Sequence, residues 1–255
     1  MAVIEISADG PITSIRLNRP DAMNAITNEM HNLLDKAFDD FAADTTQRIA
    51  VISGAGDRAF CAGSDLKDGI GKHYPRGGYA GLIERFDLSK PVIAAVDGFA
   101  LGGGFELALA CDLIIATNRA SFGLPEPLVG AVALGGGLHR LPRQIGLKQA
   151  MGLILTSRRV SADEGYRMGF VNEVVPHDRL EETVSGYCKD ILKGAPIAIE
   201  ASKMTVQRGL SEDSLKEAMK AQESYPEFTT WRKSEDAIEG IKAFAKKRKP
   251  QWTGR

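Results

Sequence analysis

Two glutamates stand where a charged side chain is unexpected. Glu106 interrupts an otherwise apolar run, and Glu126 lies between Pro125 and Pro127. Burying a carboxylate is costly unless it is paired, and flanking prolines confine a backbone to few conformations. The two acids are twenty residues apart with an apolar stretch between them, a spacing that lets both return to one pocket. Two close carboxylates in an apolar site shift each other's pKa and suit acid/base chemistry.

Each glutamate also has a simpler explanation. Glu106 could form a buried ion pair with an unidentified arginine or lysine, and the Pro-Glu-Pro sequence could be a surface turn. The residues alone leave these alternatives open.

The glycine triplet 102-GGG-104 lies between an expected strand (91–96) and an expected helix that begins near Phe105. Glycine lets a backbone N–H approach a ligand, and a helix start carries partial positive charge. For an isolated triplet, tight strand-to-helix packing is the favoured explanation. The triplet does not match the G-x-G-x-x-G dinucleotide fingerprint, which disfavours a nicotinamide oxidoreductase.

A third element is 59-AFCAGSDLK-67, a short apolar run that turns at Gly63. The turn could supply another free N–H, and Lys67 could meet a phosphate. Two converging N–H groups and two acids predict a site for a carbonyl compound whose oxygen gains charge during the reaction.

The elements that must position these residues predict an α/β core followed by helices. Residues 3–17 predict a hairpin around Asp9-Gly10-Pro11, and Thr27 can cap an amphipathic helix. The glycine-rich stretch 69–81 predicts a mobile loop, with His73 and Tyr74 as its surface residues. Beyond about Leu180 the pattern is helical. We therefore expect an α/β core over 1–190 and a helical region over 191–255.

Composition limits the class of protein. The 255 residues carry 32 basic and 33 acidic side chains and are 44% hydrophobic, which disfavours a disordered or nucleic-acid-coating chain. Three widely spaced cysteines indicate a reducing compartment, and no leader or membrane-length apolar run is present, so we expect a cytoplasmic protein. The histidine spacing predicts no metal site.

Taken together, several motifs resemble the crotonase (enoyl-CoA hydratase/isomerase) superfamily over essentially the whole chain, and within it the enoyl-CoA hydratases and carnitinyl-CoA dehydratases. The matching stretches are 16-RLNRPDAMNAI-26, 58-RAFCAGSDLK-67, 91-PVIAAVDGFALGGGFELALACD-112, 121-SFGLPE-126, 136-GGLHRLPR-143, 166-YRMGFVNEVV-175 and 234-SEDAIEGIKAFAKKRKPQWTGR-255. The resemblance implies a spiral of ββα units with a C-terminal helical subdomain for oligomerisation, assembled as a homotrimer or homohexamer.

The resemblance also implies a site for an acyl-CoA thioester, with no separate cofactor because coenzyme A is part of the substrate. By motif position, the backbone N–H groups of Ser64 and Gly103 form an oxyanion hole for the thioester oxygen. Glu106 orients and deprotonates a water that attacks the β-carbon, and Glu126 handles the proton exchanged with the α-carbon. The implied substrate-binding residues are Ala62, Asp65, Leu66, Lys67, Phe244 and Lys247, the last two reaching the adenine–phosphate end from a neighbouring subunit.

The implied activity is reversible hydration of an enoyl-CoA 2,3-double bond, as in fatty acid metabolism. The alternatives are carnitinyl-CoA dehydration and enoyl-CoA isomerisation; family isomerases often keep only the acid that matches Glu126. A more distant alternative is a non-catalytic RNA-binding or scaffolding member, which the balanced charge and both intact glutamates disfavour. The stretch 133-ALGGG-137 and Pro127 depart from the hydratase pattern, so the acyl group stays open.

Overall fold

A computed structural model describes residues 2–68 and 74–255. The chain forms two compact units: Met1–Phe86 with Val92–Ser185, and Asp87–Pro91 with Gly186–Arg255. The first unit is α/β and the second is helical apart from its loops.

The larger sheet of the first unit begins with the predicted hairpin. Its strands are β1 (Ile4–Asp9), β2 (Ile12–Leu17), β3 (Ile49–Gly54), β5 (Val92–Val96), β7 (Leu113–Thr117) and β10 (Glu173–Val175), in that spatial order. The β1–β2 pair is antiparallel and the remaining pairs are parallel. Strands β5 and β7 are almost fully buried, as expected of strands covered on both faces.

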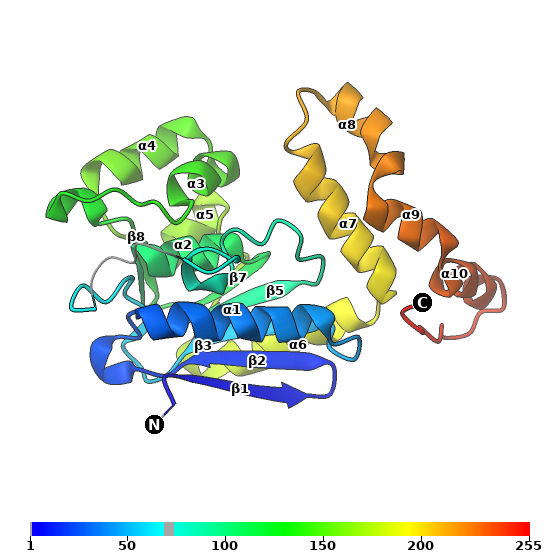
Figure 1. Cartoon of the computed structure of the whole chain (residues 1–255), viewed down its shortest axis with the longest axis horizontal. Coiled ribbons are helices and arrows are strands. Elements are labelled where there is room, and N and C mark those ends of the chain that lie inside the picture. Colours follow the sequence, from blue (N-terminus) through cyan, green and yellow to red (C-terminus); the bar gives the residue numbers. More distant parts are fainter. Residues whose placement is uncertain (1, 69–73) are drawn as a thin grey trace. The chain divides into compact units, whose positions relative to one another are not determined.

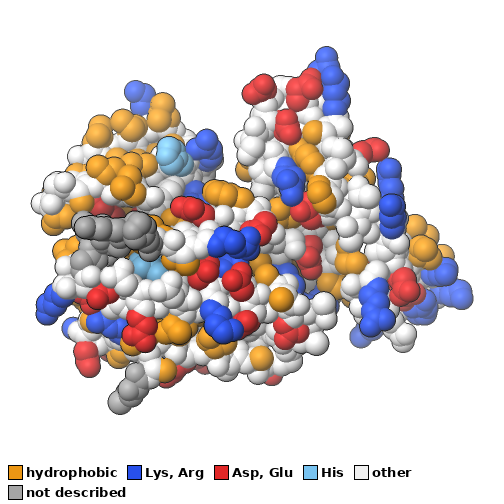
Figure 2. Space-filling model, in the orientation of Figure 1, with side chains coloured by type: hydrophobic (Ala, Val, Ile, Leu, Met, Phe, Trp, Pro, Cys, Tyr) orange, Lys and Arg blue, Asp and Glu red, His pale blue; other side chains and the backbone are white. Residues whose placement is uncertain are grey.

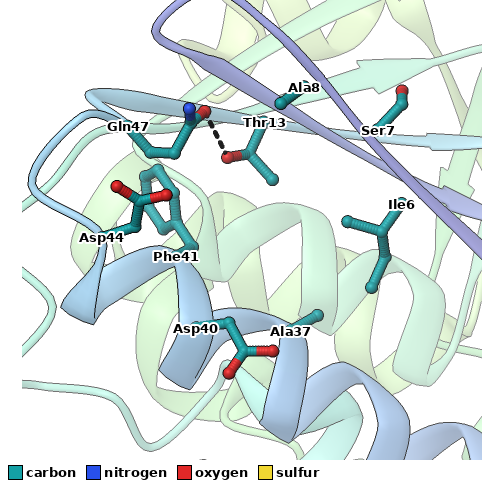
Figure 3. A pocket seen from close by; sticks show the side chains of 9 residues that line it. All are labelled: Ile6, Ser7, Ala8, Thr13, Ala37, Asp40, Phe41, Asp44 and Gln47. Atoms are coloured by element: carbon teal, nitrogen blue, oxygen red, sulfur yellow. Dashed lines mark hydrogen bonds between the residues drawn. The ribbon is translucent and has the colours of Figure 1, made fainter.

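Helix α1 (Asn28–Ala43) confirms the predicted amphipathic helix. The Thr27 side chain accepts the N–H of Met30, and the buried face carries Leu34, Phe38 and Phe41. Figure 1 shows α1 running beside the hairpin strands. Between helix and hairpin lies a surface hollow of about 250 Å³, where Thr13 Oγ1 donates to Gln47 Oε1 at 2.8 Å (Figure 3). No predicted site residue lines it.

A second sheet contains very short strands that the sequence does not predict individually. They are β4 (Ala59–Cys61), β6 (Phe99–Leu101), β8 (Ser121–Gly123) and β9 (Val160–Ser161). The chain alternates between the sheets, since β3, β5 and β7 of the larger sheet are each followed by a strand of the smaller one. Helix α2 (Gly103–Ala110) then leads from β6 back to β7. This alternation is the predicted spiral of ββα units.

The prediction of a mobile loop over 69–81 is wrong for its last residues. The short 3₁₀ turn η2 (Tyr79–Gly81) is buried, because its glycines let it pack directly on α1. The predicted surface residue His73 lies outside the described residues, and Tyr74 is 40% exposed.

The first unit also contains η1 (Pro20–Ala22), η3 (Glu126–Val129), α3 (Gly137–Ile145), α4 (Leu147–Thr156), α5 (Ala162–Met168) and η4 (His177–Arg179). Helix α6 (Leu180–Leu192) runs across the boundary in the sequence between the units. The second unit contains α7 (Pro196–Gly209), α8 (Leu215–Ala221), α9 (Pro226–Lys233) and α10 (Glu235–Ala245), and Figure 1 shows α7 and α9 side by side.

The segment Asp87–Pro91 belongs to this helical unit although it lies far from it in the sequence. Ser89 Oγ donates to Glu200 Oε2 at 2.5 Å, and Lys203 Nζ donates to the Lys90 carbonyl at 2.8 Å. Among the described residues, no helix has both the length and the apolar composition needed to cross a membrane.

Candidate active site

Three of the predicted site residues follow three neighbouring parallel strands of the smaller sheet. Ser64 comes after β4, Gly103 after β6 and Glu126 after β8, and β4 pairs with β6, which pairs with β8. Parallel strands end at the same edge of a sheet, so the topology brings these residues together. All of them lie in the first unit.

The backbone N–H groups of Ser64 and Gly103 are free to bind a ligand. Within the described part of the chain, neither N–H has a hydrogen-bond acceptor. The two segments approach closely, since a Cβ on Gly63 would lie 3.0 Å from the Leu101 carbonyl oxygen and 3.3 Å from the Gly103 nitrogen. Gly103 is also the first residue of α2, where unpaired N–H groups carry partial positive charge. Together these donors suit a developing oxyanion.

Each glycine of the triplet has its own structural reason. Gly102 adopts φ +54° and ψ −129°, a backbone conformation open essentially to glycine alone. A side chain at Gly103 would overlap the ring of Tyr79, and one at Gly104 would overlap the Cys61 carbonyl. The triplet therefore serves packing as well as ligand approach, and both explanations offered from the sequence apply.

Glu106 is only 3% exposed but forms no ion pair among the described residues. Its Oε1 accepts the backbone N–H of Gly137 at 2.9 Å, and the N–H of Gly135 also stabilises its charged form. A Cβ on Gly135 would lie 2.5 Å from Glu106 Oε2, so this close support requires glycine. The stretch that departs from the hydratase pattern, 133–137, thus holds a predicted catalytic carboxylate.

Glu126 begins the turn η3, and Pro125 and Pro127 shape the start of that turn. A Cβ on Gly102 would lie 2.8 Å from Glu126 Oε1, so this carboxylate lies directly over the glycine triplet. Its Oε2 is buried and has no hydrogen-bond partner among the described residues. An unpartnered buried carboxylate oxygen is costly and indicates a ligand or water that binds there.

The electrostatics of the two glutamates fit acid/base work near neutral pH. Burial raises the pKa of Glu106 to about 7, with a further increase from the charge of Glu126, against the lowering effect of the N–H groups that it accepts. Burial also raises the pKa of Glu126. Arg140, on α3, lowers the pKa of Glu106 by its charge while its Nη2 donates to the Ile83 carbonyl at 2.6 Å.

The predicted CoA-binding stretch after β4 has a fixed backbone and two exposed side chains, Leu66 and Lys67. Asp65 pairs with Arg19 at 2.8 Å and accepts the Lys67 N–H at 3.1 Å, so its carboxylate shapes the turn. The Ala62 N–H donates to the Met23 carbonyl at 3.0 Å. Leu66 is 68% exposed and Lys67 is also exposed, which leaves both side chains open to a ligand.

Phe244 and Lys247 lie in the second unit, on and just after α10. Phe244 is 89% exposed, and Lys247 has a positive φ of 51°. They therefore belong to a different unit from Ser64, Gly103, Glu106 and Glu126.

Sequence reasoning missed Tyr79, whose ring packs on Gly103, and His31, whose Nδ1 accepts the Ala80 N–H at 2.9 Å. It also missed Arg140. The one sequence signal for Tyr79 is the pattern 77-GGYAG-81, in which glycines surround an aromatic residue. His31 and Arg140 carry no comparable signal, because their partners lie 49 and 57 residues away in the sequence.

Comparison with known proteins identifies a family for the whole chain. A model of the enoyl-CoA hydratase/isomerase family matches residues 7–255. Carnitinyl-CoA dehydratases from Proteus mirabilis (strain HI4320) and Salmonella typhi are each 42% identical over 262 residues, covering 99% of this chain and 98% of their own.

Solved structures that resemble this chain are also enoyl-CoA hydratases. An enoyl-CoA hydratase from Mycobacterium marinum superimposes with a TM-score of 0.92 at 37% identity, covering 99% of both chains. One from Bacillus anthracis gives a TM-score of 0.90 at 34% identity and covers both chains completely. The predicted crotonase-type α/β fold and the resemblance on which it rested are confirmed.

Proposed function

This chain belongs to the enoyl-CoA hydratase/isomerase family, and we propose that it reversibly adds water to the 2,3-double bond of an enoyl-CoA thioester. It is a hydro-lyase of the hydratase/dehydratase type. The observation that carries the proposal is that the buried Glu106 and the half-buried Glu126, both of raised pKa, lie with two backbone N–H groups that have no acceptor among the described residues.

The N–H groups of Ser64 and Gly103 bind the thioester oxygen in this mechanism. Attack of water at the β-carbon pushes electrons through the conjugated system, so negative charge gathers on that oxygen. Two preorganised donors at the start of α2 stabilise the charge without reorganising. This interaction strengthens toward the transition state, which is the condition for catalysis.

The glutamates divide the proton transfers. The ionised carboxylate of Glu106, held in place by the N–H of Gly137, accepts a proton from the attacking water. Glu126 exchanges a proton with the α-carbon through its unpartnered Oε2. A pKa of about 7 for Glu106 supports the assignment, because a general base works best when its pKa lies near the operating pH. Dehydration follows the same steps in reverse.

Coenzyme A would extend from the thioester along the turn after β4. Leu66 and Lys67 are exposed there, and Lys67 offers a cation to a CoA phosphate. Phe244 and Lys247 of a neighbouring copy would reach the adenine–phosphate end. Their exposure in a single chain supports this assignment.

A homotrimer or homohexamer accords with the exposed apolar surface. Leu147, Met151 and Leu155 on α4 are 64%, 40% and 70% exposed, and Figure 2 shows hydrophobic side chains gathered over that helix. Apolar surface of this kind marks interfaces. All three cysteines are buried as thiols, which supports a reducing, cytoplasmic location.

Carnitinyl-CoA dehydration is the second candidate, favoured by the relatives that bear that name. It uses the same two carboxylates for removal of water. Isomerisation needs only one acid, so the elaborate backbone support of Glu106 favours water chemistry.

A panel of thioesters tests the proposal: crotonyl-CoA, longer straight-chain enoyl-CoAs, an aromatic enoyl-CoA and a betaine-bearing enoyl-CoA. We expect loss of the enoyl absorbance with at least one of them, and loss of turnover in a Glu106→Gln/Glu126→Gln double variant. Binding of the thioesters without any water addition would overturn the proposal. Preference for the betaine-bearing substrate would select the second candidate.

A further inference from the structure

Tyr79 lies against both residues of the proposed oxyanion hole. Its side chain is buried at 4% exposure, and the hydroxyl end of its ring fills the space where a Cβ of Gly103 would be. The Ser64 hydroxyl donates to the Tyr79 hydroxyl at 3.4 Å. The phenol therefore contacts both residues whose backbone N–H groups have no acceptor in the described part of the chain, although it lies in a different segment.

The turn that presents Tyr79 is strained and firmly held. Ala80 has a positive φ of 51°, which costs about 1–3 kcal/mol in a residue with a side chain. His31 Nδ1 accepts the Ala80 N–H at 2.9 Å, and burial lowers the pKa of His31 to about 4, so it is a neutral acceptor at physiological pH. Gly81 packs so closely on α1 that a Cβ would overlap the backbone of Asp35.

Arg85 adds a second clamp on this turn. Its Nε donates to the Gly81 carbonyl at 2.6 Å, and its Nη2 donates to Asp35 Oδ1 at 2.6 Å. The Arg85 side chain is only 2% exposed, so this interaction is shielded from water. A strained turn fixed from two directions fits a residue whose position matters for function.

The Tyr79 hydroxyl has a proton to give. Burial, together with the negative charge of neighbouring groups such as Glu106, raises the pKa of Tyr79 well above its ordinary value, so the phenol stays protonated. At 3.4 Å its bond from Ser64 is long for hydroxyl groups. Within the described part of the chain, the phenol donates to no acceptor. A buried donor without an acceptor is costly, which indicates that a bound molecule supplies one.

We propose that the Tyr79 hydroxyl is a third hydrogen-bond donor to the thioester oxygen, beside the N–H groups of Ser64 and Gly103. The inference rests on the proposed function, because it takes that oxygen to bind at the hole. The phenol keeps its proton throughout and contributes by stabilising the charge that gathers on the oxygen. A third donor, aligned by a rigid turn, strengthens the preference of the site for the transition state over the substrate.

The test compares Tyr79→Phe with Tyr74→Phe. Both variants lose only a hydroxyl, and the two rings pack edge to face at a centroid distance of 5.8 Å, so Tyr74 is a matched neighbour. The first readout is crotonyl-CoA hydration, for which Tyr79→Phe should lower kcat by about 10²-fold with little change in KM. The second is the infrared carbonyl stretch of bound butyryl-CoA labelled with ¹³C at the thioester carbon.

We expect the wild-type protein to lower the frequency of this stretch relative to free butyryl-CoA. Tyr79→Phe should return the frequency part of the way to that of free butyryl-CoA, and Tyr74→Phe should give the wild-type frequency. If the carbonyl stretching frequency of butyryl-CoA bound to Tyr79→Phe equals that in the wild-type protein, the inference is overturned even if kcat falls. The ring of Tyr79 would then act only through packing. If the wild-type protein does not shift the stretch at all, both the oxyanion hole and the role of Tyr79 are wrong.

Discussion

The backbone N–H of Gly137 donates to Glu106 Oε1 at 2.9 Å, joining the start of α3 to the first turn of α2 across 31 residues of sequence. This bond fixes the orientation of Glu106 Oε1, so that Oε2 is the oxygen that would accept a proton from water in the proposed mechanism. It also explains how a glutamate can be 3% exposed without an ion pair among the described residues, since backbone donors replace the water that burial removes. The precise position of Glu106 therefore depends on a loop whose sequence departs from the family pattern.

Replacing either glutamate tests whether the two act as a unit. Glu106→Gln and Glu126→Gln should each lower kcat for crotonyl-CoA hydration by more than about 10²-fold, because each handles a proton of the same reaction. The double variant should be little worse than the worse single variant. Isomerisation of a 3-enoyl-CoA provides the contrast, because it needs only the acid near the α-carbon. Normal hydration by Glu106→Gln with an inactive Glu126→Gln would contradict the two-carboxylate mechanism.

The pH dependence of hydration should follow Glu106. Its pKa is raised to about 7, and the base must be ionised, so kcat/KM should fall as the pH drops through about 7. Arg140→Gln removes a charge that lowers this pKa and should move the acid limb to higher pH. Arg143→Gln, an exposed change on the same helix, is the control and should leave the limb in place. An acid limb near the ordinary glutamate value would show that Glu106 is not the base.

Stability should depend on pH in the opposite sense to that of an ordinary paired carboxylate. The pKa of Glu106 is raised from 4.5 to about 7, so the folded protein holds this proton more tightly than the unfolded chain. The contribution of the Glu106 carboxyl group to the stability of the folded protein is therefore most favourable below pH 4.5 and declines as the pH rises to about 7. We therefore expect the change in the free energy of unfolding caused by Glu106→Gln to be more stabilising at about pH 8 than at about pH 4. The difference between the two pH values should be up to about 3 kcal/mol.

Glu164→Gln supplies the control for that experiment. Hydrogen bonding to Arg158 lowers the pKa of Glu164, so its stabilising contribution is present at neutral pH and lost on acidification. Denaturant titrations measure how the effect of each substitution on the free energy of unfolding changes between about pH 4 and about pH 8. This change should have opposite signs for Glu106→Gln and Glu164→Gln. The same sign for both variants would contradict the raised pKa of Glu106.

Gly104 and Ser64 should respond very differently to replacement by alanine. Gly104→Ala drives a Cβ into the Cys61 carbonyl of β4, and we expect a loss of at least about 1–3 kcal/mol of stability, measured by denaturant unfolding. Ser64→Ala keeps the backbone N–H and should leave stability nearly unchanged, with only a mild decrease in kcat. A severe loss of kcat in Ser64→Ala would show that its hydroxyl, the partner of Tyr79, has a catalytic role of its own.

Phe244 on α10 and Lys247 just after it should affect CoA binding through assembly. Truncation before Ile241 removes Phe244 and Lys247, and it should raise KM for enoyl-CoA esters. Lys247→Ala should raise KM in the intact chain and leave kcat nearly unchanged, with Lys249→Ala as the matched control. Light scattering should show a trimer or hexamer, and a monomer at micromolar concentration with normal KM would contradict the intersubunit assignment.

Local signals determined which residues to consider. Glu106 within an apolar run, Glu126 between prolines, and the turn at Gly63 are all visible in short stretches, because burial cost and backbone restriction act on neighbouring residues. The hairpin of β1 and β2 and the cap of α1 at Thr27 also follow from local patterns. The assignment of Ser64 and Gly103 as donors came from the family resemblance, since nothing in the residue types alone selects those two N–H groups.

Tertiary structure decided how these residues are positioned. The strands β4, β6 and β8 have only three residues each, too few to show periodicity, yet their shared edge gathers the site. Tyr79 reaches Gly103 only because His31 and Arg85 hold its turn against α1, through contacts that are distant in the sequence. Hydrogen bonds between segments so far apart depend on the folded chain, and the raised pKa of Glu106 depends on burial that only the complete core creates.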